Sequence, residues 1–231
     1  MRRNPKGIVR TILFLFLITS TALLAYLHFF ASGGRNLSGT WTAKQDMTEQ
    51  AAVTALGWLQ DIEAVSISLE EMEQYMQELT IEVNLTMEQS ARDTGTFSCN
   101  VMPESYDACS QAAYEAFAEA FRDLLIERLD KAGYTGGTDK ESIEALVTET
   151  FGMSTVAYLM SCGPKLLPSL EELQAQYDGS GTYKTQDGVL TRQSDDGWQV
   201  TTKTEYYLRK DSMLILSEDA EYGHSTVYLL Q

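Results

Sequence analysis

Residues 181–230 read GTYKTQDGVLTRQSDDGWQVTTKTEYYLRKDSMLILSEDAEYGHSTVYLL. Short runs of aromatic, threonine and aliphatic residues alternate here with breaks rich in Asp and Gly, which is the pattern of successive β-hairpins. The chain is therefore predicted to end in an antiparallel meander. Its five strands are expected at residues 181–184, 189–193, 198–208, 213–217 and 226–230.

Further strand signals lie upstream. Residues 79–88 alternate strictly between apolar and polar side chains, and residues 95–101 follow after a short break, which predicts a hairpin. With a first strand at 37–44, the chain has roughly eight strands. The strands at 213–217 and 226–230 are apolar on both faces, so we expect helices to cover both of their sides.

Helical signals are grouped apart from most of the strands. Asp46 and Ser68 are predicted to start two helices after the first strand. A large helical insertion at about 104–178 begins with a long helix capped by Ser105, and Thr138 starts a further helix. Helices and strands that are segregated along the chain predict the α+β class. We expect an antiparallel barrel or a strongly curved sheet that carries this insertion.

The N-terminal segment differs from the rest of the chain. Residues 11–30 contain no Asp, Glu, Lys or Arg, and as a helix they would span roughly 30 Å, the thickness of a bilayer core. Residues 1–10 carry four cations, which favours a cytoplasmic N-terminus. We expect a cytoplasmic flank, a transmembrane anchor at 11–30, a spacer at 31–36 and an extracytoplasmic domain at 37–231. A cleaved signal peptide, which would leave the domain secreted, is the alternative.

The formal net charge of −16 is divided unevenly. Residues 1–30 hold four of the 17 Lys and Arg and none of the 33 Asp and Glu, so the remainder carries −20. Such an acidic domain lacks the basic face that a nucleic-acid-binding protein requires, so we expect no nucleic-acid partner. Charge of this kind is typical of a solvated, soluble surface.

A short motif recurs at the start of three expected strands. Gly39-Thr40-Trp41 is repeated as Gly-Thr-aromatic at residues 95–97 and 181–183. Gly39-Thr40-Trp41 resembles the Gly-x-Trp signature on the first strand of lipocalins. With the meander and the anchor, the chain resembles a lipocalin-like (calycin) β-barrel domain of a membrane-anchored protein from Gram-positive bacteria. Lipocalins pack that Trp under an Arg near the C-terminus, and the last Arg of this chain is Arg209.

The resemblance implies that the chain binds a small apolar ligand or a protein of the cell envelope, and that it is not an enzyme. Trp41, Phe97, Tyr183 and Trp198 are the candidates for the lining of a barrel lumen, although ordinary core packing would explain them as well. The second hypothesis is a non-catalytic interaction or regulatory protein of the envelope. That role requires a contiguous exposed apolar patch, which we expect on the helical block.

No catalytic constellation stands out from the sequence. His28 lies within the apolar N-terminal stretch, so a hydrolase would have to use His224, which is the remote alternative. His224 stands beside Glu218, Asp219 and Glu221, where a metal site is imaginable, but a solvated acidic turn is the expected structure. We predict no catalytic residue, no metal and no cofactor.

Cys99, Cys109 and Cys162 make an odd number of cysteines. A Cys99–Cys109 disulfide is conceivable in an exported domain. Three buried thiols that pack as small apolar side chains are the favoured interpretation.

Overall fold

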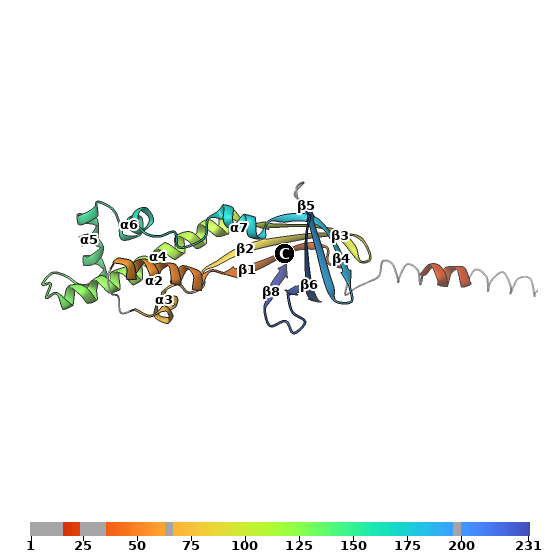
Figure 1. The fold of residues 1–231 in the computed structure, drawn as a ribbon, viewed down its shortest axis with the longest axis horizontal. Helices are drawn as coiled ribbons and strands as arrows, with labels where there is room; N and C mark the ends of the chain where they lie inside the picture. The colour runs from red at the N-terminus through yellow and green to blue at the C-terminus, as the bar shows by residue number, and fades with distance from the viewer. Residues whose placement is uncertain (1–15, 24–35, 63–66, 196–199) are drawn as a thin grey trace, which may run out of the picture. The chain divides into compact units, whose positions relative to one another are not determined.

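The fold is described from a computed structural model, which shows residues 16–23, 36–62, 67–195 and 200–231. The chain divides into two compact units, each described here by itself (Figure 1). The barrel unit comprises Met1–Thr42, Leu85–Ser98 and Gly179–Gln231, and the helical unit comprises Ala43–Asn84 and Cys99–Asp178.

Eight strands close into a barrel in which each strand pairs with its neighbour in sequence. This confirms the predicted α+β class with an antiparallel barrel. The last strand closes the ring, because the Gln231 backbone N–H donates to the Thr40 carbonyl at 3.0 Å. The strands are β1 (Gly39–Asp46), β2 (Thr80–Ala91), β3 (Thr94–Val101), β4 (Gly179–Gln186), β5 (Val189–Asp195), β6 (Val200–Lys210), β7 (Met213–Ser217) and β8 (Ser225–Leu230).

Two-residue turns set the register of the last strands. Asp187 and Gly188 have positive φ angles of 51° and 81°, the backbone shape that Asp-Gly favours between two twisted strands. Asp211, with φ of 52°, occupies the equivalent place between β6 and β7. These hairpins confirm the sequence prediction. Residues 196–199, where another turn and the start of a strand were predicted, lie outside the described residues.

The alternation predicted for β2 is present. Leu85 and Met87 are buried within the barrel unit, and Thr86 between them is half-buried. The outward Thr86 hydroxyl lies 3.3 Å from the Thr40 hydroxyl, so this position links β2 to β1. A period of two thus assigns these side chains to opposite faces of the barrel wall.

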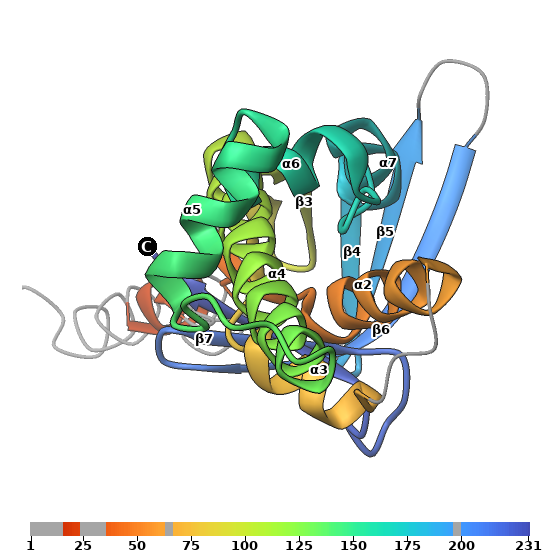
Figure 2. The ribbon, with the colours of Figure 1, turned by 90° about the vertical axis from the view of Figure 1, so that its left-hand side faces the viewer.

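Six helices are described in the helical unit (Figure 2). They are α2 (Thr48–Ile62), α3 (Leu69–Tyr75), α4 (Pro103–Lys131), α5 (Lys140–Phe151), α6 (Thr155–Cys162) and α7 (Leu170–Tyr177). Helix α4 contacts α3, α5 and α6, and fully buried Phe117 on α4 meets Trp58 of α2 edge-on, with ring centroids 5.7 Å apart. Helices α4 to α7 follow β3 and precede β4 in the chain, where the helical insertion was predicted.

Two helix starts differ from the prediction. Helix α4 begins at Pro103 after Met102, because proline suits the first turn of a helix, whereas Ser105 uses its hydroxyl to accept from the Glu82 backbone N–H at 2.8 Å. Helix α5 is capped by Asp139, not by Thr138, since the Asp139 carboxylate accepts from the Ser142 backbone N–H.

The expectation that helices cover both faces of the last strands is wrong. Leu208 on β6 and Val227 and Leu229 on β8 are 49%, 43% and 57% exposed, although all three are large aliphatic residues. Their neighbours Leu214 and Tyr228 point into the barrel and are buried. The barrel interior therefore absorbs one apolar face of these strands, and the other face is left to solvent.

The cysteines differ in part from the favoured interpretation. All three are described as thiols without a disulfide, and Cys99 and Cys109 are buried as expected. Burial raises the pKa of the Cys109 thiol to about 11, which keeps it protonated at neutral pH. Cys162 is exposed, because it is the last residue of the short helix α6.

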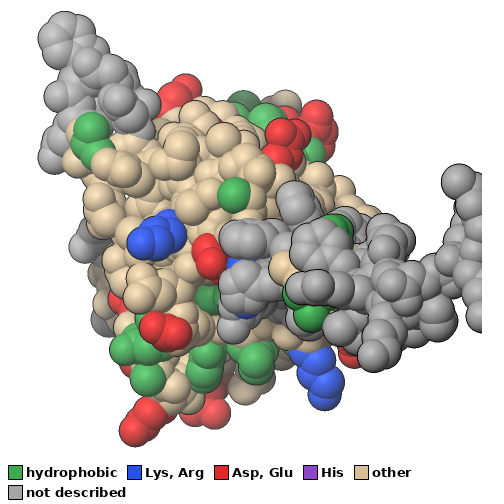
Figure 3. Space-filling view, turned by 90° about the vertical axis from the view of Figure 1, so that its right-hand side faces the viewer, with side chains coloured by type: hydrophobic (Ala, Val, Ile, Leu, Met, Phe, Trp, Pro, Cys, Tyr) green, Lys and Arg blue, Asp and Glu red, His purple; other side chains and the backbone are tan. Residues whose placement is uncertain are grey.

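Of the predicted anchor at 11–30, residues 16–23 are described, and they are helical with exposed Phe16 and Leu17. The rest of that stretch, the flank at 1–10 and most of the spacer lie outside the described residues. Within the described part of the chain, no helix is both long and apolar enough to cross a bilayer. On the face drawn in Figure 3, acidic side chains are scattered among uncharged ones.

Candidate functional site

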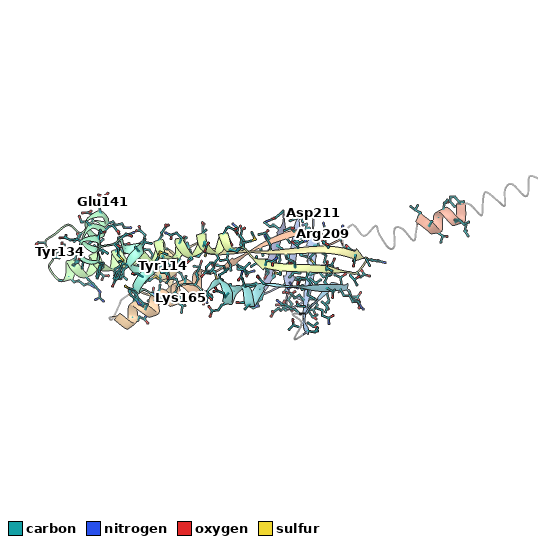
Figure 4. All side chains as sticks on the ribbon, turned by 90° about the horizontal axis from the view of Figure 1, so that it is seen from above. Tyr114, Tyr134, Glu141, Lys165, Arg209 and Asp211 are labelled. Carbon is teal, nitrogen blue, oxygen red and sulfur yellow. The ribbon has the colours of Figure 1, made fainter. Side chains whose placement is uncertain are left out.

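Trp41, the first of the predicted lumen residues, is completely buried in the barrel unit. Its indole N–H donates to the Leu37 carbonyl at 2.8 Å, and the guanidinium of Arg209, a residue labelled in Figure 4, lies 5.5 Å from its ring centroid. A cation over the face of an indole is a favourable contact. The structure thus brings together the Trp and the last Arg of the chain, although Arg209 lies on β6, two strands before the end of the chain, where the sequence did not predict this contact.

Phe97 and Tyr183 also point into the barrel, with exposed fractions of 6% and 4%, and Trp198 lies outside the described residues. The Tyr183 ring covers Gly95 so closely that a Cβ atom on Gly95 would lie 2.6 Å from it. At Gly181, a Cβ atom would lie 2.0 Å from the Gln193 carbonyl oxygen. Two of the repeated Gly-Thr-aromatic motifs therefore require glycine because neighbouring groups approach the backbone.

A cluster of charged side chains lies inside the same barrel. The Glu205 carboxylate accepts two hydrogen bonds from Arg192, at 2.6 and 3.0 Å, and lies 3.0 Å from Lys203 Nζ. Both members of the Arg192–Glu205 pair are almost completely buried, and the Arg192 guanidinium lies 5.4 Å from the Phe97 ring centroid. Such a pair is retained only where both partners are satisfied, because burying a charge is costly.

The sequence interpretation missed this cluster, although a signal for it was present. Lys203 and Glu205 share the period of two with Tyr207 and Arg209 on β6, and the pairing of β5 with β6 sets Arg192 opposite Lys203. Charged residues on a strand are usually outward-facing, so the pattern alone favoured a solvated face.

The barrel is open to water beside this cluster. Thr201 and Lys203 lie on the same face of β6 as buried Glu205, yet Thr201 is exposed and the Lys203 side chain is 56% exposed. The interior is therefore accessible at the start of β6 and closed two residues further along. The strand register sets Tyr183 on β4 opposite Arg192 on β5. We call the group formed by Arg192, Lys203, Glu205 and Tyr183 the mouth cluster.

The Tyr183 hydroxyl is the unusual member of the mouth cluster. It is buried, and no hydrogen-bond partner for it is found among the residues that the structure describes. Burial raises the pKa of Tyr183 to about 12, so the hydroxyl remains a proton donor at physiological pH. A buried donor without a partner costs free energy unless a ligand or another group accepts a hydrogen bond from it.

Replacing Tyr183 with phenylalanine is expected to raise the free energy of unfolding by about 1 kcal/mol, because it removes a polar atom that has lost its water. The matched control is Tyr114→Phe, since the Tyr114 hydroxyl donates to the Pro164 carbonyl at 2.8 Å. That control should lose about 1 kcal/mol. Urea unfolding of both variants measures the difference, and an equal loss in both would show that the Tyr183 hydroxyl has a partner.

The raised pKa of Tyr183 also predicts that the free energy of unfolding depends on pH. The folded state keeps the Tyr183 proton between its ordinary pKa of 10 and the raised value of about 12, where the unfolded chain releases it. The free energy of unfolding should therefore fall as the pH rises through this window, and less steeply in Tyr183→Phe. Urea unfolding of both proteins at pH 9 and pH 11 would test the prediction. The same change in the free energy of unfolding between these two pH values in both proteins would contradict it.

Clefts are also hollowed into the surface of the described residues. A groove of about 720 Å³ lies over the outer side of β3, β4 and β5, and its lining is mostly hydroxyl and amide groups, among them Thr96, Thr182 and Gln193. A cleft of about 660 Å³ lies between α3 and α4, and another of about 720 Å³ lies between α4 and α5. Of the predicted lumen residues that are described, Tyr183 lines the groove over β3, β4 and β5, whereas Trp41 and Phe97 line none of these three clefts.

His224 is exposed in the turn between β7 and β8. The Asp219 carboxylate accepts from the backbone N–H groups of Gly223, Glu221 and His224, and these bonds hold its pKa below the usual range. Asp219 thus shapes its own turn. Among the described residues, no three His, Cys, Asp or Glu side chains are gathered as ligands for a metal ion.

The fold and the interior define a class of protein, an α+β chain built on a closed eight-stranded antiparallel barrel. A scan against models of protein families finds no match, and no curated protein or solved structure matches the chain.

Proposed function

We propose that the chain is a membrane-anchored, extracytoplasmic, lipocalin-like binding domain that takes an amphipathic anion at the mouth cluster and is not an enzyme. The observation that carries this proposal is a water-accessible barrel end with two cations around one carboxylate. The contact between Arg209 and Trp41 supports the lipocalin-like assignment.

The charges of the mouth cluster favour an anion as the ligand. Arg192 and Lys203 together exceed Glu205 by one positive charge, in a chain whose formal charge beyond residue 30 is −20. A guanidinium has five N–H donors, and the two bonds to Glu205 use two of them. The Tyr183 hydroxyl adds a donor, so a carboxylate or phosphate headgroup would find several.

The surroundings of the mouth cluster suit an apolar body on that ligand. Phe97 lies against the Arg192 guanidinium, and Leu190 and Leu216 are buried on the inner face of the neighbouring strands. A binding site of this type combines an apolar lining with a few polar groups that orient the ligand. A fatty acid or another lipid-like anion has that chemistry.

A fluorescent fatty acid, dansyl-undecanoic acid, serves as the probe for this site. Lys203→Ala in the full chain is expected to weaken its binding by about tenfold to a hundredfold, because a hydrogen bond to a charged group is lost. Lys184→Ala is the matched control, since Lys184 is exposed on the outer side of β4, opposite to the side on which Tyr183 is buried. Equal affinity in the two variants would contradict binding at this site.

The anchor is supported by the charge-free apolar stretch at 11–30 and by the cations that precede it. Intact-mass measurement of the chain from its host membrane should give the full mass. Loss of about 33 N-terminal residues would show that the segment is a cleaved signal peptide and would contradict the anchor.

A second function, interaction with another envelope protein, is favoured by an apolar patch on α5 and α6. Phe151 and Met160 are 46% and 51% exposed, and the Phe151 ring stacks on Tyr158 with centroids 4.3 Å apart. A photo-crosslinker at Met160 in the host membrane should then capture one defined protein. The same crosslinker at Val53, which is 50% exposed on α2, is the control, and equal capture at both positions would contradict a specific interface.

A further inference from the structure

The outer face of β6, β7 and β8 carries a continuous row of apolar side chains. The strand register places Leu208 opposite Ile215 and Ile215 opposite Val227, and the next row places Met213 opposite Leu229. All five residues share the outward side, because Leu214, Leu216 and Tyr228 between them are buried in the barrel. We call these five residues the apolar face.

This face is unlike the outer side of the opposite strands. The outward residues of β3, β4 and β5 are mostly Thr, Ser, Asn and Gln, which are typical of a strand face in contact with water. On the apolar face, Leu208, Val227 and Leu229 are about half exposed within a contiguous sheet. Contiguous exposed apolar surface on a folded domain marks a place where another molecule or a membrane makes contact.

The apolar face lies at the end of the barrel where the N-terminal segment enters. The Leu230 backbone N–H donates to the Ser212 carbonyl and the Gln231 N–H to the Thr40 carbonyl, so the Met213–Leu229 row adjoins the start of β1. Residues 31–38, which are the spacer at 31–36 and two further residues, separate the apolar stretch at 11–30 from β1, which starts at Gly39. Eight residues reach at most about 29 Å, so an anchored chain holds this end of the barrel close to the bilayer.

The charges around the apolar face also favour contact with a lipid bilayer. Lys210 is the one charged residue at the outward positions of the described strands β6, β7 and β8, and it pairs with Met213 at the end near β1. The carboxylates lie in the turns that bound the face, among them Asp211, which is labelled in Figure 4 and directly follows Lys210 in the sequence. Apolar side chains bordered by a cation are the composition of surfaces that rest in a lipid interface.

We propose that the apolar face rests in the outer interface of the bilayer that holds the anchor, with Lys210 at the level of the lipid headgroups. This inference rests on the anchor of the proposed function and is independent of the ligand at the mouth cluster. In this arrangement the barrel is held against the membrane by its side wall as well as by its N-terminal segment. The mouth cluster, at the opposite end of β6 from Lys210, stays accessible to water.

The experiment uses the full chain in vesicles of phosphatidylcholine. The exposed Cys162 is replaced by serine so that it takes up no label, and Cys99 and Cys109 are protected from the label by their burial. An environment-sensitive nitrobenzoxadiazole label is placed at Leu229→Cys, and at Thr96→Cys on the outer side of β3 as the matched control. We expect the label at 229 to emit at shorter wavelength and to lose most of its fluorescence to doxyl-labelled lipids. The label at 96 should behave as it does in water.

A charge reversal provides the second readout. In vesicles that also contain phosphatidylglycerol, Lys210→Glu should weaken the quenching of the label at 229, whereas Lys184→Glu on the outer side of β4 should leave it unchanged. An equal effect of the two reversals would mean that net charge alone acts, and it would overturn the role of Lys210 at the interface.

The remaining outcomes distinguish the failure of the anchor from the failure of the contact between the apolar face and the bilayer. If alkaline carbonate fails to extract the chain but the label at 229 stays as aqueous as that at 96, the anchor stands and this inference is overturned. If carbonate extracts the chain, the anchor is wrong and the inference fails with it. If the label at 229 shifts without lipid quenching, and more strongly at higher protein density, the apolar face binds a second copy of the chain and not the bilayer.

Discussion

Replacing Glu205 with leucine is expected to lower the free energy of unfolding by about 3–5 kcal/mol, because it leaves the buried Arg192 guanidinium without its carboxylate. Arg192 and Glu205 are bound by two hydrogen bonds inside the barrel, and their side chains are 11% and 6% exposed. Lys203 is more than half exposed and can turn to water when Glu205 is removed, so the loss is concentrated on Arg192. Urea unfolding of the full chain in detergent measures it.

The control for this variant is Glu218→Ala. Glu218 also lies near Lys203, at 4.0 Å, but its side chain is 80% exposed, so the substitution should change the stability by no more than about 0.5 kcal/mol. The double variant Arg192→Leu with Glu205→Leu should recover most of the loss, because both charges leave the interior together. A double variant that is as unstable as the single one would mean that packing, and not the lost charge, explains the effect.

Replacing Trp41 with alanine is expected to cost about 3–5 kcal/mol, because a completely buried indole leaves a large cavity. The variant also removes the hydrogen bond to the Leu37 carbonyl and the surface on which Arg209 rests. Thermal and urea unfolding followed by circular dichroism would measure the loss. A cost below about 1 kcal/mol would contradict the position of Trp41 in the core.

A double-mutant cycle separates the Arg209 contact from the cavity. Trp41→Phe keeps an aromatic face, so it should retain part of the coupling with Arg209, whereas Trp41→Ala should abolish it. The coupling between Trp41→Ala and Arg209→Ala is expected to be about 0.5–2 kcal/mol, the range of cation–π contacts. If the losses in the free energy of unfolding of the two alanine substitutions simply add in the double variant, Arg209 does not stabilise the Trp41 site.

Much of the fold follows from short-range sequence patterns. The period of two in β2 and the Asp-Gly turn at 187–188 specify strands and a hairpin without reference to distant residues. The α3 helix begins with the Ser-x-x-Glu box at Ser68, which the sequence predicts and the structure confirms, and α7 begins with the same kind of box at Ser169. Helix α4 starts at Pro103 and not after Ser105, because the fixed φ angle of proline suits the first turn of a helix.

The mouth cluster could be predicted only in part. Its member Tyr183, like Phe97 beside it, is predicted from the Gly-Thr-aromatic motif as a lumen or core residue, and both are buried in the barrel. Arg192, Lys203 and Glu205 were missed, because a charged side chain on a strand faces solvent unless a partner across the sheet neutralises it. That partner is known only once the register of β5 and β6 is known.

The sequence by itself determined the elements of this protein, the segregation of helices from strands and the division of its charge, since each depends on residues within a few positions of one another. The tertiary structure alone decided which side chains meet. Closure of the barrel brought Arg209 over Trp41 and Arg192 to Glu205, and it left the apolar face of β6, β7 and β8 outside. The reason is geometric, because closing a sheet buries one side of every strand, and where both sides are apolar the sequence does not say which will be buried.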